Sequence, residues 1–413
     1  MRLFAILALA AVLAGPAAAA PQLLGDGGVP DFYAVSGKVK GKPGRLIRQE
    51  ALEPALVLDN AASAVRILYS STDGLGGKDR VAVSGALFLP KGEAPKGGWP
   101  LLAWAHGTVG VADICAPSLA GRSPRDKTYL GFWLSRGYAV VASDYQGLGA
   151  PGGHPYLATR PSAYSMLDSI RAVQKAGFPV SRSVVLIGQS QGGGAAFATA
   201  AYAPSYAPEL DIRGTVATGT PYFSPEAQAA LQAARPRDAV DPTLGYNFLI
   251  HSLLEQIDPG FRLEDYVTEA ALPLTRSVAT SCFGELAGSV VRGGWTFNRA
   301  YRADPADRMM PAYALMGYPT LEIPTPVFMG AGAADRDVPP GMQLSLAADA
   351  CKAGTRIEAH VYPGLDHSGA VNGSTRESSA FVEAVFAGRP VAGNCDALPR
   401  PPADPFPPAR RLP

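Results

Sequence analysis

Short runs of apolar residues recur along the chain and alternate with segments of helical character. Most of the later runs are almost continuously apolar, which is typical of parallel strands covered by helices on both faces. The pattern predicts strands at residues 65–69, 81–89, 101–105, 139–142, 184–188, 214–218, 326–330 and 357–362. It predicts helices at residues 127–136, 162–176, 191–202, 340–352 and 376–386. The expected fold class is therefore α/β, with a mostly parallel central sheet and helices on both faces.

The alternation stops between residues 221 and 324. This segment is rich in Pro, Ala and aromatic residues and has no clear strand, but residues 226–234 and 246–257 favour helix. Its aromatic and aliphatic content argues against a disordered loop. We expect a mainly helical cap inserted into an α/β domain that spans residues 21–220 and 325–395, with an independent small domain as the alternative.

Both ends of the chain differ from the rest in composition. Arg2 precedes an apolar run at residues 3–15 and small residues at 16–20, the pattern of a secretory signal peptide. The run is short for a membrane span, which needs about 20 apolar residues. The sequence thus predicts a signal peptide at residues 1–20 and a secreted or periplasmic protein. The tail at residues 396–413 is rich in proline and should be extended.

Charge excludes several classes of partner. The formal net charge is only +1, so nothing indicates binding to nucleic acid or to an anionic membrane surface. No stretch after the signal peptide is long and apolar enough for stable membrane insertion. Transient contact with a lipid interface remains compatible with this composition.

Four cysteines are present: Cys115, Cys282, Cys351 and Cys395. An even number in an exported chain predicts two disulfides, and spacing alone leaves all three pairings open. No metal site is expected, because the spacing lacks a CxxC pair and nearby histidines.

A strand, a tight turn and a helix meet at Ser190. The apolar run 183–187 leads into Gly188-Gln-Ser-Gln-Gly192, and a helix of small residues follows. This Gly-x-Ser-x-Gly turn holds a nucleophilic serine in a strained conformation, and the flanking glycines prevent side-chain collisions. The helix N-terminus behind the serine makes the N–H of Gln191 an expected oxyanion donor.

The order of the remaining catalytic candidates follows from this turn. In this fold an acid and then a histidine follow the serine, each in a loop after a strand. The loop after residues 326–330 contains Asp335, our first choice, and Asp337, our second. His367 follows the last strand and is the expected base. His251 comes too early, in the cap, and His360 lies within a strand, so both are interpreted as structural.

The second oxyanion donor should follow the strand 101–105. Gly107 permits close approach of the backbone, and the N–H of Thr108 is the predicted donor. His106 is interpreted as a structural residue beneath this loop. The Gly-x-Gly-x-x-Gly match at residues 147–152 contains Pro151, which prevents the helix of a dinucleotide site, so no cofactor is expected.

These residues resemble the secretory lipase family of fungal extracellular lipases and bacterial relatives. The similar pieces are His106-Gly-Thr, Cys115-Ala-Pro-Ser, Ser143-Asp-Tyr-Gln-Gly-Leu-Gly, His154-Pro-Tyr-Leu and Gly188-Gln-Ser-Gln-Gly, together with the loops of Asp335 and His367. The resemblance implies an α/β-hydrolase fold with a helical cap and disulfides Cys115–Cys282 and Cys351–Cys395.

The resemblance also implies a carboxylic ester hydrolase that uses the triad Ser190, Asp335 and His367. The expected substrates are small-molecule or lipid esters, including acylglycerols. A peptidase or other acyl hydrolase on the same fold is the enzymatic alternative, because fold does not determine substrate. A secreted binding protein on an inactive scaffold is the non-enzymatic alternative.

Overall fold

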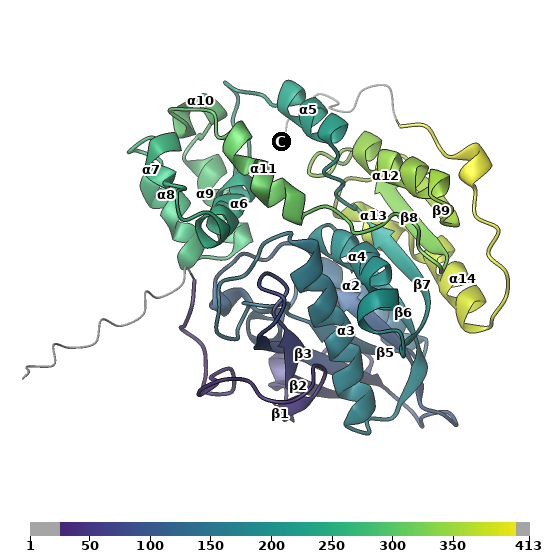
Figure 1. Ribbon diagram of the computed structural model, residues 1–413. Coiled ribbons are helices and arrows are strands. Elements are labelled where there is room, and N and C mark those ends of the chain that lie inside the picture. The colour runs from purple at the N-terminus through teal and green to yellow at the C-terminus, as the bar shows by residue number, and fades with distance from the viewer. Residues whose placement is uncertain (1–24, 402–413) are drawn as a thin grey trace, which may run out of the picture.

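The computed structural model describes residues 25–401 and contains a nine-stranded sheet with helices packed around it (Figure 1). The strands, in chain order, are β1 Leu46–Ala51, β2 Ala61–Thr72, β3 Arg80–Pro90, β4 Trp99–Ala105, β5 Ala139–Ser143, β6 Val180–Gln189, β7 Asp211–Thr218, β8 Val327–Gly332 and β9 Ile357–Tyr362. Their order in the sheet is β1-β2-β3-β5-β4-β6-β7-β8-β9.

Parallel pairing dominates this sheet. The first three strands are antiparallel, and β3 pairs antiparallel with β5, whereas every pair from β5 to β9 is parallel. On β4, Leu102 faces Val140 of β5 and Val185 of β6. The predicted α/β class, with a mostly parallel sheet, is confirmed.

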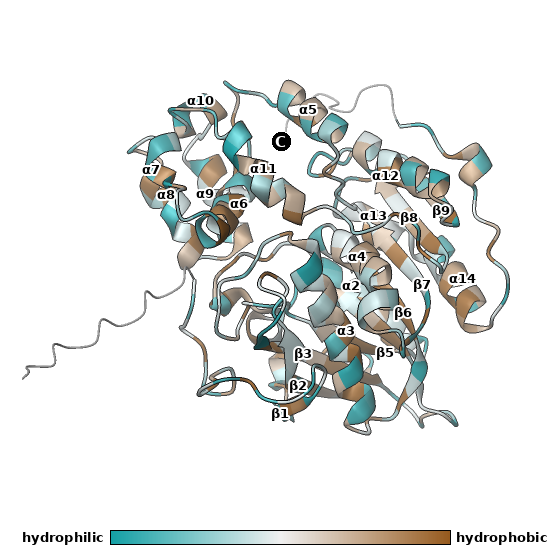
Figure 2. Cartoon of the chain, viewed as in Figure 1, coloured by the Kyte–Doolittle hydropathy of each residue, from teal (hydrophilic) through white to brown (hydrophobic). Residues whose placement is uncertain are grey.

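Helices cover both faces of the sheet because successive residues on each strand point to opposite sides. On β4, Leu101 and Ala103 pack with residues of α3 Thr159–Lys175, α4 Gln191–Tyr206 and α12 Pro340–Lys352. The alternate residues, Leu102 and Trp104, pack with residues of α2 Pro124–Ser135 and α14 Thr375–Phe386. These helices carry hydrophilic as well as hydrophobic residues, as helices with one buried face do (Figure 2).

Two features of the sheet differ from the prediction. Strand β1 was not predicted, since its six residues are only partly buried and lack an apolar run. Several predicted strands extend further; β2, for example, covers Ala61–Thr72 rather than residues 65–69. The short helices α1 Pro117–Ala120 and α13 Gly369–Gly373 were also missed.

Seven helices lie between β7 and β8, in the segment where a helical cap was predicted. They are α5 Pro225–Ala234, α6 Leu244–Ile257, α7 Leu263–Tyr266, α8 Leu272–Arg276, α9 Phe283–Arg292, α10 Phe297–Ala300 and α11 Ala306–Leu315. Helices α6 to α10 gather on one side above the sheet (Figure 1). They share an apolar core with Val111 and Tyr156 of the α/β part. We refer to residues 221–324 as the cap.

Two disulfides link distant parts of the chain. Cys115 is bonded to Cys282 at the start of α9, and Cys351 of α12 is bonded to Cys395. Both pairings are those that the family resemblance implied. The first bond joins the α/β part to the cap, and the second joins the C-terminal segment to α12, which packs against the sheet.

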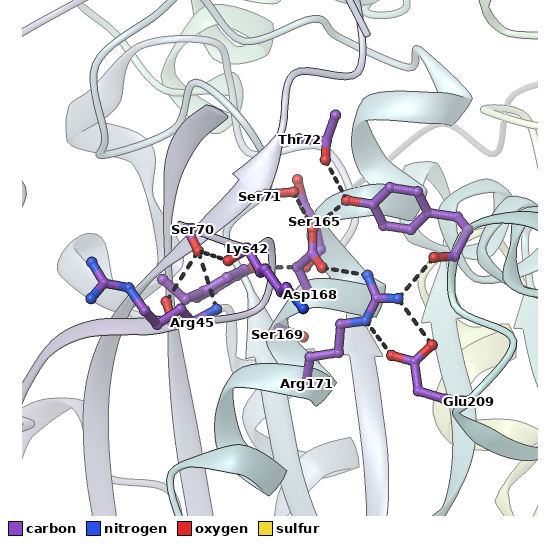
Figure 3. Close-up of polar contacts among 12 residues, drawn as sticks. Lys42, Arg45, Ser70, Ser71, Thr72, Ser165, Asp168, Ser169, Arg171 and Glu209 are labelled. Atoms are coloured by element: carbon purple, nitrogen blue, oxygen red, sulfur yellow. Dashed lines mark hydrogen bonds and ion pairs between the residues drawn. The ribbon is translucent and has the colours of Figure 1, made fainter. Parts of the chain in front are cut away.

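A buried polar network connects β2, α3 and the end of α4 (Figure 3). The Asp168 carboxylate accepts hydrogen bonds from Ser71, Tyr206 and Arg171, at 2.7, 2.7 and 2.9 Å. Arg171 also donates to Glu209 at 2.7 Å. Because Asp168 is fully buried, these donors supply the hydrogen bonds that water would otherwise make.

The predicted signal peptide, residues 1–20, lies outside the described residues, as do residues 402–413 of the predicted tail. Within residues 25–401, no helix combines the length and apolar character that crossing a bilayer requires.

Candidate active site

Ser190 lies in the turn between β6 and α4, with a backbone φ of 61° and ψ of −125°. A non-glycine residue adopts such a positive φ only where the surroundings impose it. The neighbouring glycines allow it. A Cβ on Gly188 would lie 2.0 Å from the carbonyl oxygen of Gly192, and a Cβ on Gly192 would lie 1.9 Å from that of Ala105. The Gly-x-Ser-x-Gly pattern is therefore a packing requirement of this turn.

Ser190 is held at the N-terminus of α4. Its N–H donates to the carbonyl of Thr218 on β7 at 2.9 Å, and the residue is only 8% exposed. Gln191 is the first residue of α4, so its N–H has no acceptor within the helix. The helix dipole adds partial positive charge at this end, which favours a developing oxyanion beside Ser190.

Asp335 and His367 come from the loops after β8 and β9. Nδ1 of His367 lies 2.8 Å from Oδ2 of Asp335. The carboxylate also accepts the N–H groups of Asp337 and Val338 and the amide of Gln343, at 2.9 to 3.0 Å. With four N–H groups directed at it, this fully buried carboxylate is held in one orientation.

This contact determines which nitrogen of His367 is available. A carboxylate accepts hydrogen bonds, so Nδ1 carries the hydrogen and Nε2 of the neutral ring is the acceptor. Nε2 is buried and has no hydrogen-bond partner among residues 25–401. It is therefore free to take a proton from a nucleophile.

The pKa of His367 is raised above its ordinary value of 6.5. Burial alone would lower it, because it disfavours the charged ring. The hydrogen bond and negative charge of Asp335, with a smaller contribution from Asp337, outweigh burial, while the positive charge of Arg125 opposes them. The site thus stabilises the imidazolium that forms when His367 takes a proton.

Asp337, the second-choice acid, has a different contact. Its carboxylate accepts a hydrogen bond from the hydroxyl of Tyr246 on α6 at 2.7 Å and is exposed to solvent. Ligand atoms of Asp335, Asp337 and His367 lie within 4.8 Å of one another, a spacing that a cation could use. Because the Asp335 carboxylate already faces four N–H donors, we interpret Asp335 and His367 as an acid–base pair rather than as metal ligands.

Thr108 follows β4 in a tight loop. A Cβ on Gly107 would lie 2.9 Å from Oε1 of Gln189 and 3.3 Å from its carbonyl oxygen, so a side chain at residue 107 would require Gln189 to shift. The Thr108 hydroxyl lies 2.7 Å from the hydroxyl of Tyr156. The side-chain amide of Gln191 lies 3.1 Å from Nε2 of His154. Both predicted oxyanion residues are therefore anchored by their side chains.

The three histidines that were interpreted as structural all pack against other residues. His106 is buried, and its ring stacks 4.2 Å from that of Tyr145. His251 is buried within the cap, where its Nε2 lies 3.4 Å from the Tyr301 hydroxyl. His360 stacks 5.1 Å from Phe328 on the sheet.

A cavity of about 290 Å³ opens at Ser190 between the sheet and the cap. Thr108, Tyr156, Leu157 and Gln191 line it from the α/β part. Its cap side includes Phe223, Leu231, Tyr246, Ile250, Phe297, Met309 and Tyr313. This volume is near the lower end of the range for small-molecule sites.

Sequence reasoning missed four residues that hold this site: His154, Tyr156, Tyr246 and Gln343. The His154-Pro-Tyr piece belongs to the family resemblance, which assigns it no role. Tyr246 carried no local signal, since it meets Asp337 only through the folding of distant segments. Gln343 lies eight positions after Asp335, on the helix that follows its loop, and no motif marked it.

The comparisons with known proteins agree with this fold. The family model for secretory lipases matches residues 123–227. Lipase A of Moesziomyces aphidis is 29% identical over 52% of this chain and 48% of its own. A probable inactive lipase of Mycobacterium tuberculosis is 29% identical over 45% of this chain and 44% of its own. The matched region thus spans less than half of these relatives.

A solved structure extends the likeness over most of the fold. The closed state of Candida antarctica lipase A has a TM-score of 0.68 and 21% identity, and covers 89% of this chain and 87% of that chain. At this identity the likeness concerns the fold alone. Over residues 123–227 this chain is thus similar to the secretory lipase family, and its mostly parallel sheet with flanking helices is the α/β-hydrolase fold of the solved lipase structure.

Proposed function

We propose that this protein is an exported ester hydrolase that acts through an acyl-enzyme on Ser190. The observation that carries the proposal is the combination of Ser190 on its strained turn with a hydrogen-bonded Asp335–His367 pair, in which Nε2 of His367 has no hydrogen-bond partner in the described part of the chain. Relatives that are lipases support an ester as the substrate. Lipid-like esters, including acylglycerols, are the leading class.

The reaction follows from the geometry of these groups. Ser190 Oγ attacks the ester carbonyl while its proton moves to Nε2 of His367, and the carbonyl electron pair moves onto oxygen. The N–H groups of Thr108 and Gln191 stabilise this oxyanion. As the intermediate collapses, the ester C–O bond breaks and His367 protonates the departing alcohol. Water then repeats these steps on the acyl-enzyme and releases the acid.

The cap supplies one wall of the proposed substrate site. The cavity beside Ser190 is lined by both parts of the chain, so the cap should select the acyl group. In this proposal, residues 21–220 and 325–395 form the catalytic domain, and residues 221–324 select the substrate.

Export is part of the same proposal. Disulfides such as Cys115–Cys282 and Cys351–Cys395 persist in oxidising compartments. Together with the signal-like segment at residues 1–20, they support a secreted or periplasmic location. Sequencing the N-terminus of protein recovered from outside the cytoplasm tests this, and an intact Met1 would argue against it.

Hydrolysis of a chain-length series of p-nitrophenyl esters, together with triolein, tests the activity against Ser190→Ala. We expect turnover by the native protein and none above background by the variant. A fluorophosphonate probe should label Ser190 in the folded protein. An unlabelled Ser190 would instead favour a binding protein on an inactive scaffold, the condition that the mycobacterial relative's name describes. Faster turnover of matched amides would favour a peptidase.

A further inference from the structure

Residues 154–157, between β5 and α3, lie against both predicted oxyanion residues. This segment, hereafter the 154–157 segment, contains Leu157 with a φ of 61°, and its first turn is closed by a 2.9 Å bond from the N–H of Tyr156 to the carbonyl of His154. The catalytic steps above assign it no role. Its contacts nevertheless converge on the loop of Thr108 and on the start of α4.

His154 holds the side chain of Gln191. Nδ1 of His154 lies 2.8 Å from the carbonyl oxygen of Gln146. Since a carbonyl oxygen only accepts, Nδ1 must carry the hydrogen, and Nε2 must accept the amide N–H of Gln191, 3.1 Å away. Burial lowers the pKa of His154 to about 4, so the ring stays neutral at neutral pH and keeps this arrangement.

Tyr156 holds the side chain of Thr108. The two hydroxyls lie 2.7 Å apart, and the Tyr156 ring is buried in the apolar core that the cap shares with the α/β part. A tyrosine ring fixed by packing has little freedom to move its hydroxyl. The contact therefore restrains the loop that carries the Thr108 N–H.

The segment is itself fixed by the cap. The side-chain amide of Gln256 on α6 donates to the carbonyl of His154 at 3.1 Å. One short segment thus meets the cap through His154 and Tyr156 and contacts both predicted donors of the oxyanion hole.

We propose that His154 and Tyr156 are positioning residues that keep the N–H groups of Gln191 and Thr108 directed at the point where the oxyanion forms. The inference rests on the proposed ester hydrolysis and adds residues that prepare its transition state. Donors held in advance stabilise the developing charge without the cost of reorientation. Loss of either side-chain contact, that of His154 with Gln191 or that of Tyr156 with Thr108, should therefore lower kcat and leave KM nearly unchanged.

Two substitutions of His154 separate its two contacts. In His154→Gln, a side-chain oxygen can replace Nε2 and accept from Gln191. In His154→Asn, the shorter amide can replace Nδ1 and donate to Gln146, but it cannot reach Gln191. Tyr156→Phe removes only the hydroxyl that meets Thr108. The matched control is His251→Asn, which alters a buried histidine that touches neither oxyanion residue and does not line the cavity.

The measurements are kcat and KM for p-nitrophenyl butyrate, the Ki of an alkyl trifluoromethyl ketone that mimics the tetrahedral intermediate, and the melting temperature. Removing a direct oxyanion donor costs about 100- to 1,000-fold in kcat, so loss of one of these side-chain contacts should cost about tenfold. We expect that loss in His154→Asn and Tyr156→Phe, with a matching rise in Ki. His154→Gln should retain most activity, and His251→Asn should change only the melting temperature.

Equal kcat in His154→Asn and His154→Gln, or an unchanged kcat in Tyr156→Phe, would overturn the inference. A fall in kcat without a rise in Ki would do the same, because it would indicate a merely structural role. If His154→Asn fails to fold, Tyr156→Phe still tests the inference, because it keeps the buried ring and removes only the hydroxyl. If the native protein hydrolysed no ester, both the proposed function and this inference would be wrong. If the native protein were active and the variants were unaffected, only this inference would be wrong.

Discussion

Asp335 and His367 are joined by a 2.8 Å contact between Oδ2 and Nδ1, although 32 positions separate them in the chain. Asp337, two residues further along the same loop, contacts Tyr246 of the cap instead. The loop after β8 thus directs one carboxylate towards the histidine and the other towards the proposed substrate cavity.

Asp335→Asn should lower kcat by about 1,000- to 10,000-fold with little change in KM, because an amide can present a donor to His367 and favour the wrong tautomer. Steady-state kinetics on a p-nitrophenyl ester measures both constants. Asp337→Asn is the matched control and should retain most activity at its pH optimum. A larger loss in Asp337→Asn would reassign the catalytic acid.

The raised pKa of His367 predicts the pH dependence of the reaction. Since the base must be neutral, kcat/KM should fall as the pH decreases through a value above 6.5. Asp337→Asn removes a negative charge that stabilises the protonated ring, so its acidic limb should move to lower pH. Arg125→Gln removes an opposing positive charge and should move the limb to higher pH. Shifts in the same direction would refute this electrostatic account.

The turn at Ser190 could be predicted from sequence because all of its determinants are local. One strand, the two glycines that flank Ser190 at a distance of two residues, and one helix lie within residues 180–206, and each has its own composition signal. Strand order placed the acid in the loop that contains Asp335 and Asp337, whereas the contacts that distinguish the two come from His367, Gln343 and Tyr246. His367 and Tyr246 are distant in the chain from the aspartates that they contact, and such partners leave no local pattern.

The cap shows where pattern reading fails. Helix α6 has 14 residues and was predicted, but α7 and α10 have only four each, too few to establish a helical period. Strand β1 was missed for a related reason, since Leu46–Ala51 lies at the edge of the sheet and is mostly exposed. The disulfide pairing could not be derived from spacing, and only the family resemblance selected it.

Loss of the Cys115–Cys282 bond should reduce activity as well as stability. Phe283, the residue after Cys282, donates its N–H to the carbonyl of Val109 at 2.8 Å, directly beside the predicted oxyanion residue Thr108. In the chain-entropy description, a loop with a separation of 167 residues contributes about 5 kcal/mol. We expect Cys115→Ser with Cys282→Ser to lower both the melting temperature and kcat.

The second disulfide provides the comparison for that variant. The Cys351–Cys395 bond closes a separation of 44 residues between α12 and the C-terminal segment, and neither cysteine lines the cavity. Its removal through Cys351→Ser with Cys395→Ser should lower the melting temperature but leave kcat per folded molecule nearly unchanged. An equal loss of kcat in the two double variants would contradict a specific link between Cys115–Cys282 and the oxyanion loop.

The buried network around Asp168 should contribute to stability without affecting catalysis (Figure 3). Asp168→Ala would leave the buried hydroxyl of Ser71 without its acceptor, and Arg171 would keep only Glu209 and the Tyr206 carbonyl. Breaking such a buried pair costs about 3–5 kcal/mol in the free energy of unfolding. Urea unfolding of the purified protein measures this cost. Lys352→Met, which removes an exposed pair with Asp349, should cost about 1 kcal/mol or less. Comparable losses in the two variants would mean that burial does not strengthen the Asp168 network.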